Sequence, residues 1–359
     1  MLYRETGQFK TSYVADQAIF PIRQDRYLAA AALVLAYVAV PILGTEYWLL
    51  TIMIPFLVFT LAAIGLNILT GYAGQLSLGT GGFMAVGAFA TYKITTSFPG
   101  LNIVVVFVLA GIITALVGVM FGWPSLRIKG FYLAVATLAS QFFLIWMFNK
   151  FPWFNNYTAS GVISAPPRAV FGHFFVTGAE ANPVNKYLFV LTVVVVMAFI
   201  AKNLVRGRVG RSWMAMRDMD IAAEIIGIRP LQTKLLAFAI SSFYCGISGA
   251  MWAFIYTGGV EALAFDIDRS FQILFMIIIG GLGSILGSFL GAAFIVLLPI
   301  WLENVPRLLG VNIPVNYISN TQSMVFGALI VFFLIVEPRG LARLWQIGKE
   351  KLRMWPFPY

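Results

Sequence analysis

The sequence predicts an all-α, polytopic membrane protein, a helical bundle with about ten transmembrane helices. Hydrophobic residues fill 60% of the 359 positions and charged residues only 11%, whereas about a quarter of the residues in a soluble domain are charged. Apolar stretches without charge recur along the chain and are long enough to cross a hydrocarbon layer as helices. The basic residues concentrate in segments between these stretches, a pattern typical of cytoplasmic loops.

The first half of the chain contains five candidate spans. The interval between Glu46 and Lys93 has no charged residue over 46 positions, which is about 69 Å of helix and enough for two spans. The Gly-rich stretch 71–74 is the natural break between them. The five predicted spans are 28–45, 47–70, 79–97, 101–122 and 131–149.

The second half begins with a segment rich in Pro and Asn, 150–186, which is predicted to form a loop outside the membrane. Residues 270–302 carry no charge over 33 positions, about 50 Å of helix, which is too long for one span and short for two. The Gly-rich stretch 280–284 at the centre predicts two shortened helices that meet at a glycine break. The other predicted spans are 187–201, 235–257 and 321–336.

The distribution of Lys and Arg orients the chain in the membrane. With ten spans, the two termini and the loops at 123–130 and 202–234 lie on one side and hold 18 of the 24 basic residues. Cytoplasmic segments carry such an excess, so both termini are expected in the cytoplasm. The predicted parts are a cytoplasmic segment 1–27, a transmembrane domain 28–336 with a cytoplasmic loop 202–234 and an external loop 150–186, and a basic cytoplasmic tail 337–359.

The sequence excludes several classes of function. The net charge of +10 comes from these basic segments between spans, so nucleic acid is not an expected partner. The single His and single Cys, His173 and Cys245, cannot build a His/Cys metal site. The sequence has no phosphate-binding loop of the G-x-x-x-x-G-K-S/T type. No predicted span holds an ionisable residue near its centre, which argues against an ion-coupled carrier and a membrane-embedded hydrolase.

The cytoplasmic segment 206–230 is the most specific feature of the sequence. Residues 214–226 contain neither Gly nor Pro, and Gly227 and Pro230 follow as stop signals, so one short helix is expected. A helix too short to be stable alone suits docking into a groove on another protein. The alternative left open is a basic loop held against lipid headgroups. The residues expected on the apolar face of the helix are Met216, Met219, Ala222, Ala223 and Ile226.

Four stretches of the sequence resemble one known family. The stretch RDMDIAAEIIGI (217–228), followed by KLLAF (234–238), is similar to the coupling segment of LivM-type permeases, the membrane subunits of branched-chain amino acid ABC importers. The resemblance runs over residues 50–342 and implies a fold similar to type II ABC importers. The other matching stretches, in the family's order and spacing, are GLNILTGYAGQLSLG (65–79), PSLRIKGFYLA (124–134) and GGLGSILG (280–287).

The resemblance implies that the chain is a permease subunit that forms one half of a translocation pathway for branched-chain amino acids or a related small solute. The implied partners are a second related permease subunit, two cytoplasmic ATP-binding subunits, a periplasmic solute-binding protein and membrane lipid. ATP and Mg would be used by the partner subunits, so this chain would bind no cofactor or metal and hold no catalytic residue. The implied location is the bacterial inner membrane.

The expected site residues form two groups. By resemblance, the ATPase-coupling residues are Arg217, Asp220, Ala222, Ala223, Glu224 and Gly227. Glu224 would offer a carboxylate to the ATPase or cap its own helix, and Gly227 would allow the turn back to the next span. The glycine-rich elements 71–87 and 280–291 fit either a pathway lining or close helix packing. The candidate pathway residues are Gln75, Ser77, Thr80, Gln272, Gly280, Gly281 and Gly283.

The sequence leaves the solute open. Similar permeases serve amides, urea, other amino acids or small aromatic acids, and family members often carry a His where this chain has Thr80. Two other classes of function stay as alternatives, a stand-alone channel or carrier and a membrane enzyme that acts on lipids. Each of these would work without partner subunits, which separates them from a permease subunit.

Overall fold

A computed structural model describes most of the chain. Several expectations lie outside the described residues: most of the N-terminal segment, Arg127 and Lys129 of the 123–130 loop, His173, and the beginning of the predicted span 321–336. The described residues are 11–12, 23–125, 132–158, 161–170, 174–178, 181–308, 324–325, 327–329, 331–333, 335–337 and 340–354.

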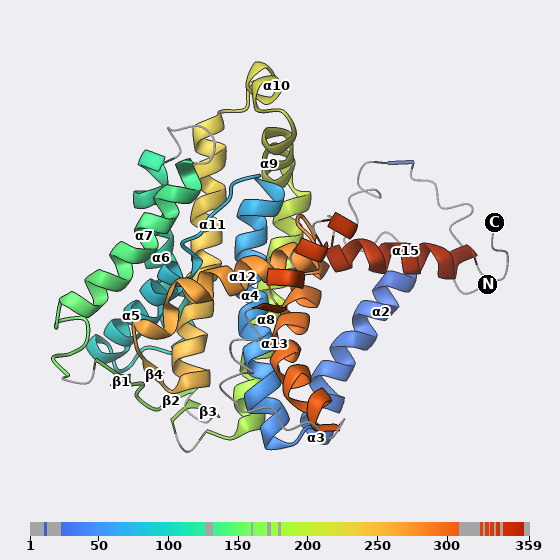
Figure 1. Ribbon diagram of the computed structural model, residues 1–359. Helices are drawn as coiled ribbons and strands as arrows, with labels where there is room; N and C mark the ends of the chain where they lie inside the picture. Colours follow the sequence, from blue (N-terminus) through green and yellow to red (C-terminus); the bar gives the residue numbers. More distant parts are fainter. Residues whose placement is uncertain are drawn as a thin grey trace.

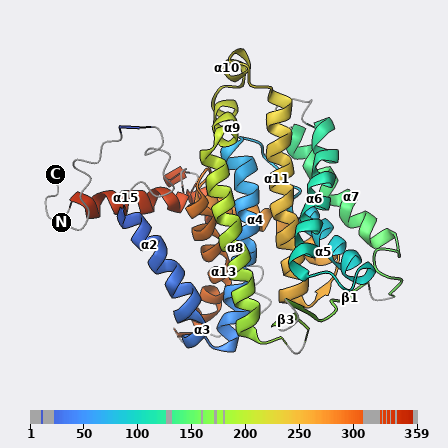
Figure 2. The same ribbon diagram turned by 180° about the vertical axis from the view of Figure 1, so that it is seen from behind.

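The described residues form a bundle whose long helices run side by side (Figures 1 and 2). Seven helical segments among them are long and apolar enough to cross a membrane, and they fall on seven of the ten predicted positions. This confirms a multi-pass, helical membrane protein. The seven segments are Arg26–Leu43, Trp48–Tyr72, Ile103–Ser125, Tyr132–Lys150, Pro183–Arg206, Pro230–Thr257 and Ile285–Asn304.

The bundle is built almost entirely from α-helices. The described α-helices are α2 (Arg23–Val34), α3 (Val40–Leu43), α4 (Ile54–Asn67), α5 (Thr80–Ser97), α6 (Ile103–Ser125), α7 (Tyr132–Lys150), α8 (Pro183–Arg206), α9 (Arg208–Asp218), α10 (Asp220–Ile225), α11 (Pro230–Met251), α12 (Ile267–Gly280), α13 (Ile285–Leu308) and α15 (Gly340–Met354). The π-helical turns η1 (Leu35–Ala39), η2 (Trp48–Met53), η3 (Ile68–Tyr72) and η4 (Trp252–Thr257) extend them, and η5 (Leu263–Phe265) is a 3-10 turn. The strands are β1 (Ile163–Ser164), β2 (Arg168–Val170), β3 (Phe174–Thr177) and β4 (Gly259–Val260).

Two of the predicted spans differ from a simple lipid-facing helix. α5 has 18 residues and is buried along most of its length, so it lies inside the bundle. α12 has 14 residues, about 21 Å of helix, which is less than the roughly 30 Å of a hydrocarbon core. α13 has 24 residues and continues through Glu303 to Leu308. The expectation of two shortened helices at the glycine break is therefore right for α12 and wrong for α13.

Helices also extend beyond the predicted loop boundaries. α8 begins at Pro183, because the Asn182 side chain accepts a 2.9 Å hydrogen bond from the Val184 amide and Pro suits the first turn. The predicted external loop 150–186 therefore ends earlier. Most of the predicted loop 202–234 is helical as well, from the end of α8 to the start of α11. The predicted boundaries lie at charged residues. Such residues mark where a helix leaves the lipid, but the helix itself can continue into water, and this explains why both loops are shorter than predicted.

α5 and α11 lie at the centre of the bundle and touch through glycines. A Cβ atom added at Gly249 of α11 would lie 1.9 Å from the Met84 carbonyl oxygen of α5. A Cβ atom added at Gly87 would lie 2.1 Å from the Gly246 carbonyl oxygen. A larger side chain at either position would push the two helices apart. Small residues allow the close contact that holds helices together in lipid, where no hydrophobic force drives them.

The end of the bundle opposite α10 is covered by short strands (Figure 1). β1 pairs with β4, and β2 pairs with β3, both in antiparallel orientation. The Arg168 guanidinium of β2 donates to the carbonyl oxygens of Pro99 and, at 2.7 Å, Thr95. These bonds hold the loop between α7 and α8 against the end of α5.

The glycine contact between α5 and α11 generates a stability prediction. Gly249→Val should lower the free energy of unfolding by roughly 1–3 kcal/mol, because the new side chain overpacks the interface. Unfolding of the purified chain in detergent by SDS, followed by circular dichroism, measures the change. Gly100→Val is the matched control, since a Cβ atom there meets nothing within 4 Å. Equal stability of the two variants would contradict the proposed role of the contact.

Candidate functional site

The segment predicted as one helix over 214–226 forms two helices. α9 ends at Asp218 and α10 begins at Asp220, and Met219 between them has extended backbone angles of −153° and 95°. The Trp213 side chain of α9 is fully buried, and its indole nitrogen donates to the Thr233 carbonyl oxygen at 3.0 Å. Because α9 is held against the bundle in this way, the chain bends at Met219 before α10 projects beyond the other helices (Figure 1).

The end of α10 is a left-handed glycine turn. Gly227 has a φ angle of +92°, which favours glycine. Its amide donates to the Glu224 carbonyl oxygen at 3.0 Å, and the Ile228 amide donates to the Ala223 carbonyl oxygen at 3.0 Å. These two bonds form a Schellman motif, which ends a helix and satisfies its last carbonyl groups. Pro230 then starts α11 and returns the chain to the bundle.

α10 exposes a set of large apolar side chains, named here the α10 patch. The apolar face expected for this segment is only partly right, because Met216 and Ala223 are buried against the bundle. Such a patch at the tip of a projecting segment marks a contact with another molecule. Ala222, Glu224 and Asp220, whose carboxylate accepts from the Ile221 amide at 2.9 Å, are exposed beside it. The members of the patch are Met219, Ile221, Ile225 and Ile226, each at least 70% exposed.

Arg217 connects the base of α10 to the membrane helices. One guanidinium nitrogen lies 2.9 Å from an Asp218 carboxylate oxygen, and another donates to the Gly71 carbonyl oxygen of η3 at 2.8 Å. The approach is close, since a Cβ atom added at Gly74 would lie 2.7 Å from the Arg217 Cγ atom. The predicted coupling residue Arg217 and the glycine-rich segment after α4 therefore meet in space.

Asn67, at the end of α4, holds the turn between α12 and α13. The Asn67 amide nitrogen donates to the Ser284 carbonyl oxygen at 2.8 Å and to the Ser288 hydroxyl at 2.9 Å. The Asn67 amide oxygen accepts from the Gly283 amide at 2.8 Å. Asn67 is fully buried, so these bonds form away from water. The sequence prediction missed this residue, and the available signal was one Asn inside a long apolar run.

The candidate pathway glycines form the turn that Asn67 holds. Gly281 and Gly283 have φ angles of +119° and +75°, which only glycine adopts easily. A Cβ atom added at Gly280 would lie 2.0 Å from the Gly287 carbonyl oxygen, so the two helices meet closely. The turn lies beside Gly71, because a Cβ atom added there would lie 2.3 Å from the Gly283 amide nitrogen. Packing and turn geometry therefore explain these glycines.

The start of α5 lies inside the bundle after a non-helical stretch, 73–79. The first amides of a helix lack partners within the helix. Here the Gly81 amide donates to the Ser270 hydroxyl at 2.8 Å and the Gly82 amide to the Gln141 amide oxygen. The Gln141 amide nitrogen donates to the Phe265 carbonyl oxygen at 2.8 Å. Gln141 and Ser270 therefore replace water at this helix end, and the sequence prediction missed both.

The other candidate pathway residues lie around the same helix start. Ser77 and Thr80 are buried. Gln75 is buried too, and neither polar atom of its side chain has a hydrogen-bond partner among the described residues. Gln272 lies on α12, where its amide oxygen accepts from the Arg269 guanidinium at 2.9 Å. Gln75 thus has unused hydrogen-bonding capacity, whereas Gln272 is engaged.

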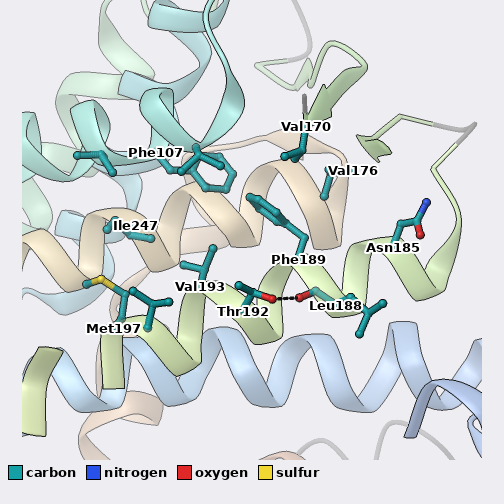
Figure 3. Close-up of a pocket in the computed structure, with 13 residues that line it drawn as sticks. Phe107, Val170, Val176, Asn185, Leu188, Phe189, Thr192, Val193, Met197 and Ile247 are labelled. Carbon is teal, nitrogen blue, oxygen red and sulfur yellow. Dashed lines mark hydrogen bonds between the residues drawn. The ribbon is translucent and has the colours of Figure 1, made fainter. Parts of the chain in front are cut away.

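A large cavity lies away from all of these residues. It has a volume of about 490 Å³ and lies between α6, α8 and α11 beside β2 and β3 (Figure 3). Phe107, Phe189, Val193 and Ile247 line it, and its Thr192 hydroxyl already donates to the Leu188 carbonyl oxygen at 2.8 Å. Its almost wholly apolar wall suits lipid better than a polar solute. Among the described residues, no cluster of His, Cys, Asp and Glu could hold a metal ion.

Comparison with known proteins identifies relatives of the chain. Residues 48–334, well over half of it, match a family described as "Branched-chain amino acid transport system / permease component". The high-affinity branched-chain amino acid transport system permease protein LivM of Salmonella typhimurium is 29% identical over 306 residues, which cover 79% of this chain and 68% of that protein. The protein with the same description from Escherichia coli has the same identity and coverage. No solved structure matches the chain at a significant level.

The buried bonds of Asn67 generate a second prediction. Asn67→Leu should lower the free energy of unfolding by roughly 2 kcal/mol or more, because it leaves buried polar groups of the turn without partners. SDS unfolding of the purified chain measures the loss. Asn304→Leu is the matched control, since Asn304 is exposed and, among the residues that the structure describes, bonds to Ile300 of its own helix. A variant at Asn67 that is as stable as the control would contradict this role.

Proposed function

This chain belongs to the family of permease components of branched-chain amino acid transport systems, and we propose that it forms one half of the translocation pathway of an ABC importer for branched-chain amino acids. Separate subunits hydrolyse the ATP that drives transport. The observation that carries this proposal is the α10 patch. A permease that is driven by ATP hydrolysis in a separate subunit needs a surface outside the membrane on which that subunit docks. The relatives named for high-affinity branched-chain amino acid transport support the choice of solute.

The surroundings of the α10 patch support a contact with an ATP-binding subunit. Burial of exposed apolar surface in a partner's groove favours association, because it removes that surface from water. Asp220 and Glu224 are exposed carboxylates beside the patch, and they orient the contact through charge. Ala222 is small and exposed, which allows close approach. Arg217, Ala223 and Gly227 hold α10 in position through the bonds and burial described above.

A series of direct contacts supports transmission from the α10 patch to the membrane interior. Arg217, in the last turn of α9, bonds to Gly71, and Gly71 lies against both Asn67 and Gly283. Asn67 in turn holds the turn between α12 and α13. Close-packed contacts of this kind transmit displacement because protein interiors have low compressibility. A movement of α10 is therefore expected to shift the end of α4 and the turn together.

The polar residues near the start of α5 support a solute path there. A buried amide without partners, such as Gln75, is costly unless a ligand or water satisfies it, and a passing amino acid offers suitable polar groups. Ser77 and Thr80 are the neighbouring hydroxyls, and Gln272 lies on the short helix that runs from this cluster to the glycine turn. Transport proteins commonly place broken helices at the solute path. In this proposal Gly280, Gly281 and Gly283 form the hinge at the far end of α12.

The proposed topology has ten spans with both termini in the cytoplasm. α5 and α12 are the third and eighth spans, and residues 324–336, helical where described, belong to the tenth. The proposed assembly contains a second related permease subunit, two cytoplasmic ATP-binding subunits and a periplasmic solute-binding protein, in the bacterial inner membrane. ATP and Mg bind to the partner subunits, and this chain binds no cofactor and catalyses no reaction itself.

A change in the α10 patch should separate coupling from folding. The double substitution Ile225→Ser and Ile226→Ser should abolish most ATP-driven uptake and weaken co-purification of the ATP-binding subunits at least tenfold, because it removes apolar contact area. Membrane insertion and thermal stability should not change, because both side chains are at least 74% exposed. Leu263→Ser, at an exposed position near the opposite end, is the control. Unchanged uptake in the double variant would exclude α10 as the coupling contact.

The solute assignment predicts a specific transport result. The complete complex in proteoliposomes, with its binding protein, should accumulate labelled leucine only with ATP, and isoleucine and valine should compete. The chain alone should show no flux. Competition by urea, amides or small aromatic acids instead would place the chain in the same importer class with another solute. Flux through the chain alone would show a stand-alone channel or carrier.

A further inference from the structure

α15 is an amphipathic helix that extends sideways from the bundle. In both overall views it runs across the direction of α8 and α13 and lies beside the N-terminal end of α2 (Figures 1 and 2). The apolar residues Leu341, Leu344 and Trp345 recur at helical spacing, and Arg343, Gln346 and Glu350 lie on other sides of the helix. A helix of this kind buries its apolar side against something other than water.

The first turn of α15 is fixed to the glycine turn between α12 and α13. Gly340 has a φ angle of +65°, and a Cβ atom added there would lie 2.5 Å from the Ile279 carbonyl oxygen and 2.7 Å from the Gly281 amide nitrogen. Ala342 is buried in the same contact region. The start of α15 therefore has one position relative to the bundle, and the rest of the helix points away from it.

Beyond this first turn, the described residues leave large apolar side chains of α15 about half exposed. Trp345 is 55% exposed and Leu344 is 47% exposed. The helix is also basic, since its sequence holds four Lys and Arg residues against the single Glu350. Apolar residues with a Trp on one side and an excess of basic residues are typical of helices that lie in a membrane surface.

We propose that α15 is a membrane-surface helix that binds the anionic headgroups of the cytoplasmic leaflet. Leu344 and Trp345 enter the boundary between headgroups and acyl chains, and Lys351, two turns after Leu344 on the same side of the helix, contacts lipid phosphates. Lipid is the occupant because the helix runs across the direction of the spans, carries net positive charge and begins at the end where α2 and α13 start. The proposal does not depend on which solute the protein carries.

This placement gives the glycine turn two supports. Asn67 holds the turn from the side of α4, and Gly340 fixes α15 against it from the side of the membrane surface. The leaflet therefore positions one side of the same turn that Arg217 approaches through Gly71. Through α15, the lipid surface contributes to the position of this turn.

Site-directed spin labelling of the full chain tests the depth of α15. The only cysteine, Cys245, is buried, so a Cys245→Ala background accepts single labels at Trp345→Cys and, as the matched control, Gln346→Cys. These neighbours are about 100° apart around the helix. In vesicles of phosphatidylcholine with phosphatidylglycerol, the label at 345 should be reached by oxygen and sheltered from a water-soluble nickel chelate. The label at 346 should show the reverse.

Two outcomes of this measurement would overturn the proposal. Equal access of the chelate to both labels would show that α15 lies in water. A label at 345 sheltered from both oxygen and the chelate would show that protein covers this side instead of lipid.

A second arm tests the anionic headgroups. The substitution Lys351→Gln should raise chelate access to the label at 345 several-fold in vesicles with phosphatidylglycerol. In phosphatidylcholine alone, the chain with and without this substitution should show the same, higher access. The Lys351 side chain is exposed, and elution as a single species checks folding. No effect of the substitution, or of lipid charge, would overturn the binding of anionic headgroups.

Discussion

The hydrogen bonds of the Asn67 side chain constrain the rest of this structure. The ends of an interrupted helix carry backbone groups that need hydrogen-bond partners where the protein excludes water, and the chain breaks between α12 and α13. The Asn67 amide provides both a donor and an acceptor at that break, and it reaches Ser284, Ser288 and Gly283 at 2.8–2.9 Å. Because the Asn67 side chain is buried, these bonds fix the turn to α4 more firmly than the same bonds would in water.

The start of α5 is a second place where helix-end backbone groups inside the bundle need hydrogen-bond partners. There the side chains of Gln141 and Ser270 accept hydrogen bonds from the first amides of the helix. α12 connects the two places, since Ser270 lies near its start and Gly280 ends it. The protein therefore contains two interrupted helices whose ends are satisfied by uncharged side chains.

Two elements project from the bundle, and both are fixed near one turn. α10 is held through Arg217 on Gly71, and α15 is held through Gly340 on Gly281. Each presents large apolar side chains that the described residues leave about half exposed or more. In the proposed importer, α10 meets an ATP-binding subunit and α15 meets the leaflet. The turn between α12 and α13 then lies next to both the segment that contacts the ATPase and the helix that contacts the membrane surface.

The sequence by itself determined the membrane class, the positions of most spans, the glycine break at 280–284 and the segment that projects as α10. These features follow from local properties, since apolar length, charge and glycine content act within short stretches. Only the tertiary structure decided the bend at Met219, the burial of Ala223, the full length of α13 and the partners of Asn67 and Gln141. Each depends on residues far apart in the chain, as with Asn67 and Gly283. The residue pattern of one segment does not indicate which distant polar group will form hydrogen bonds with the end of an interrupted helix.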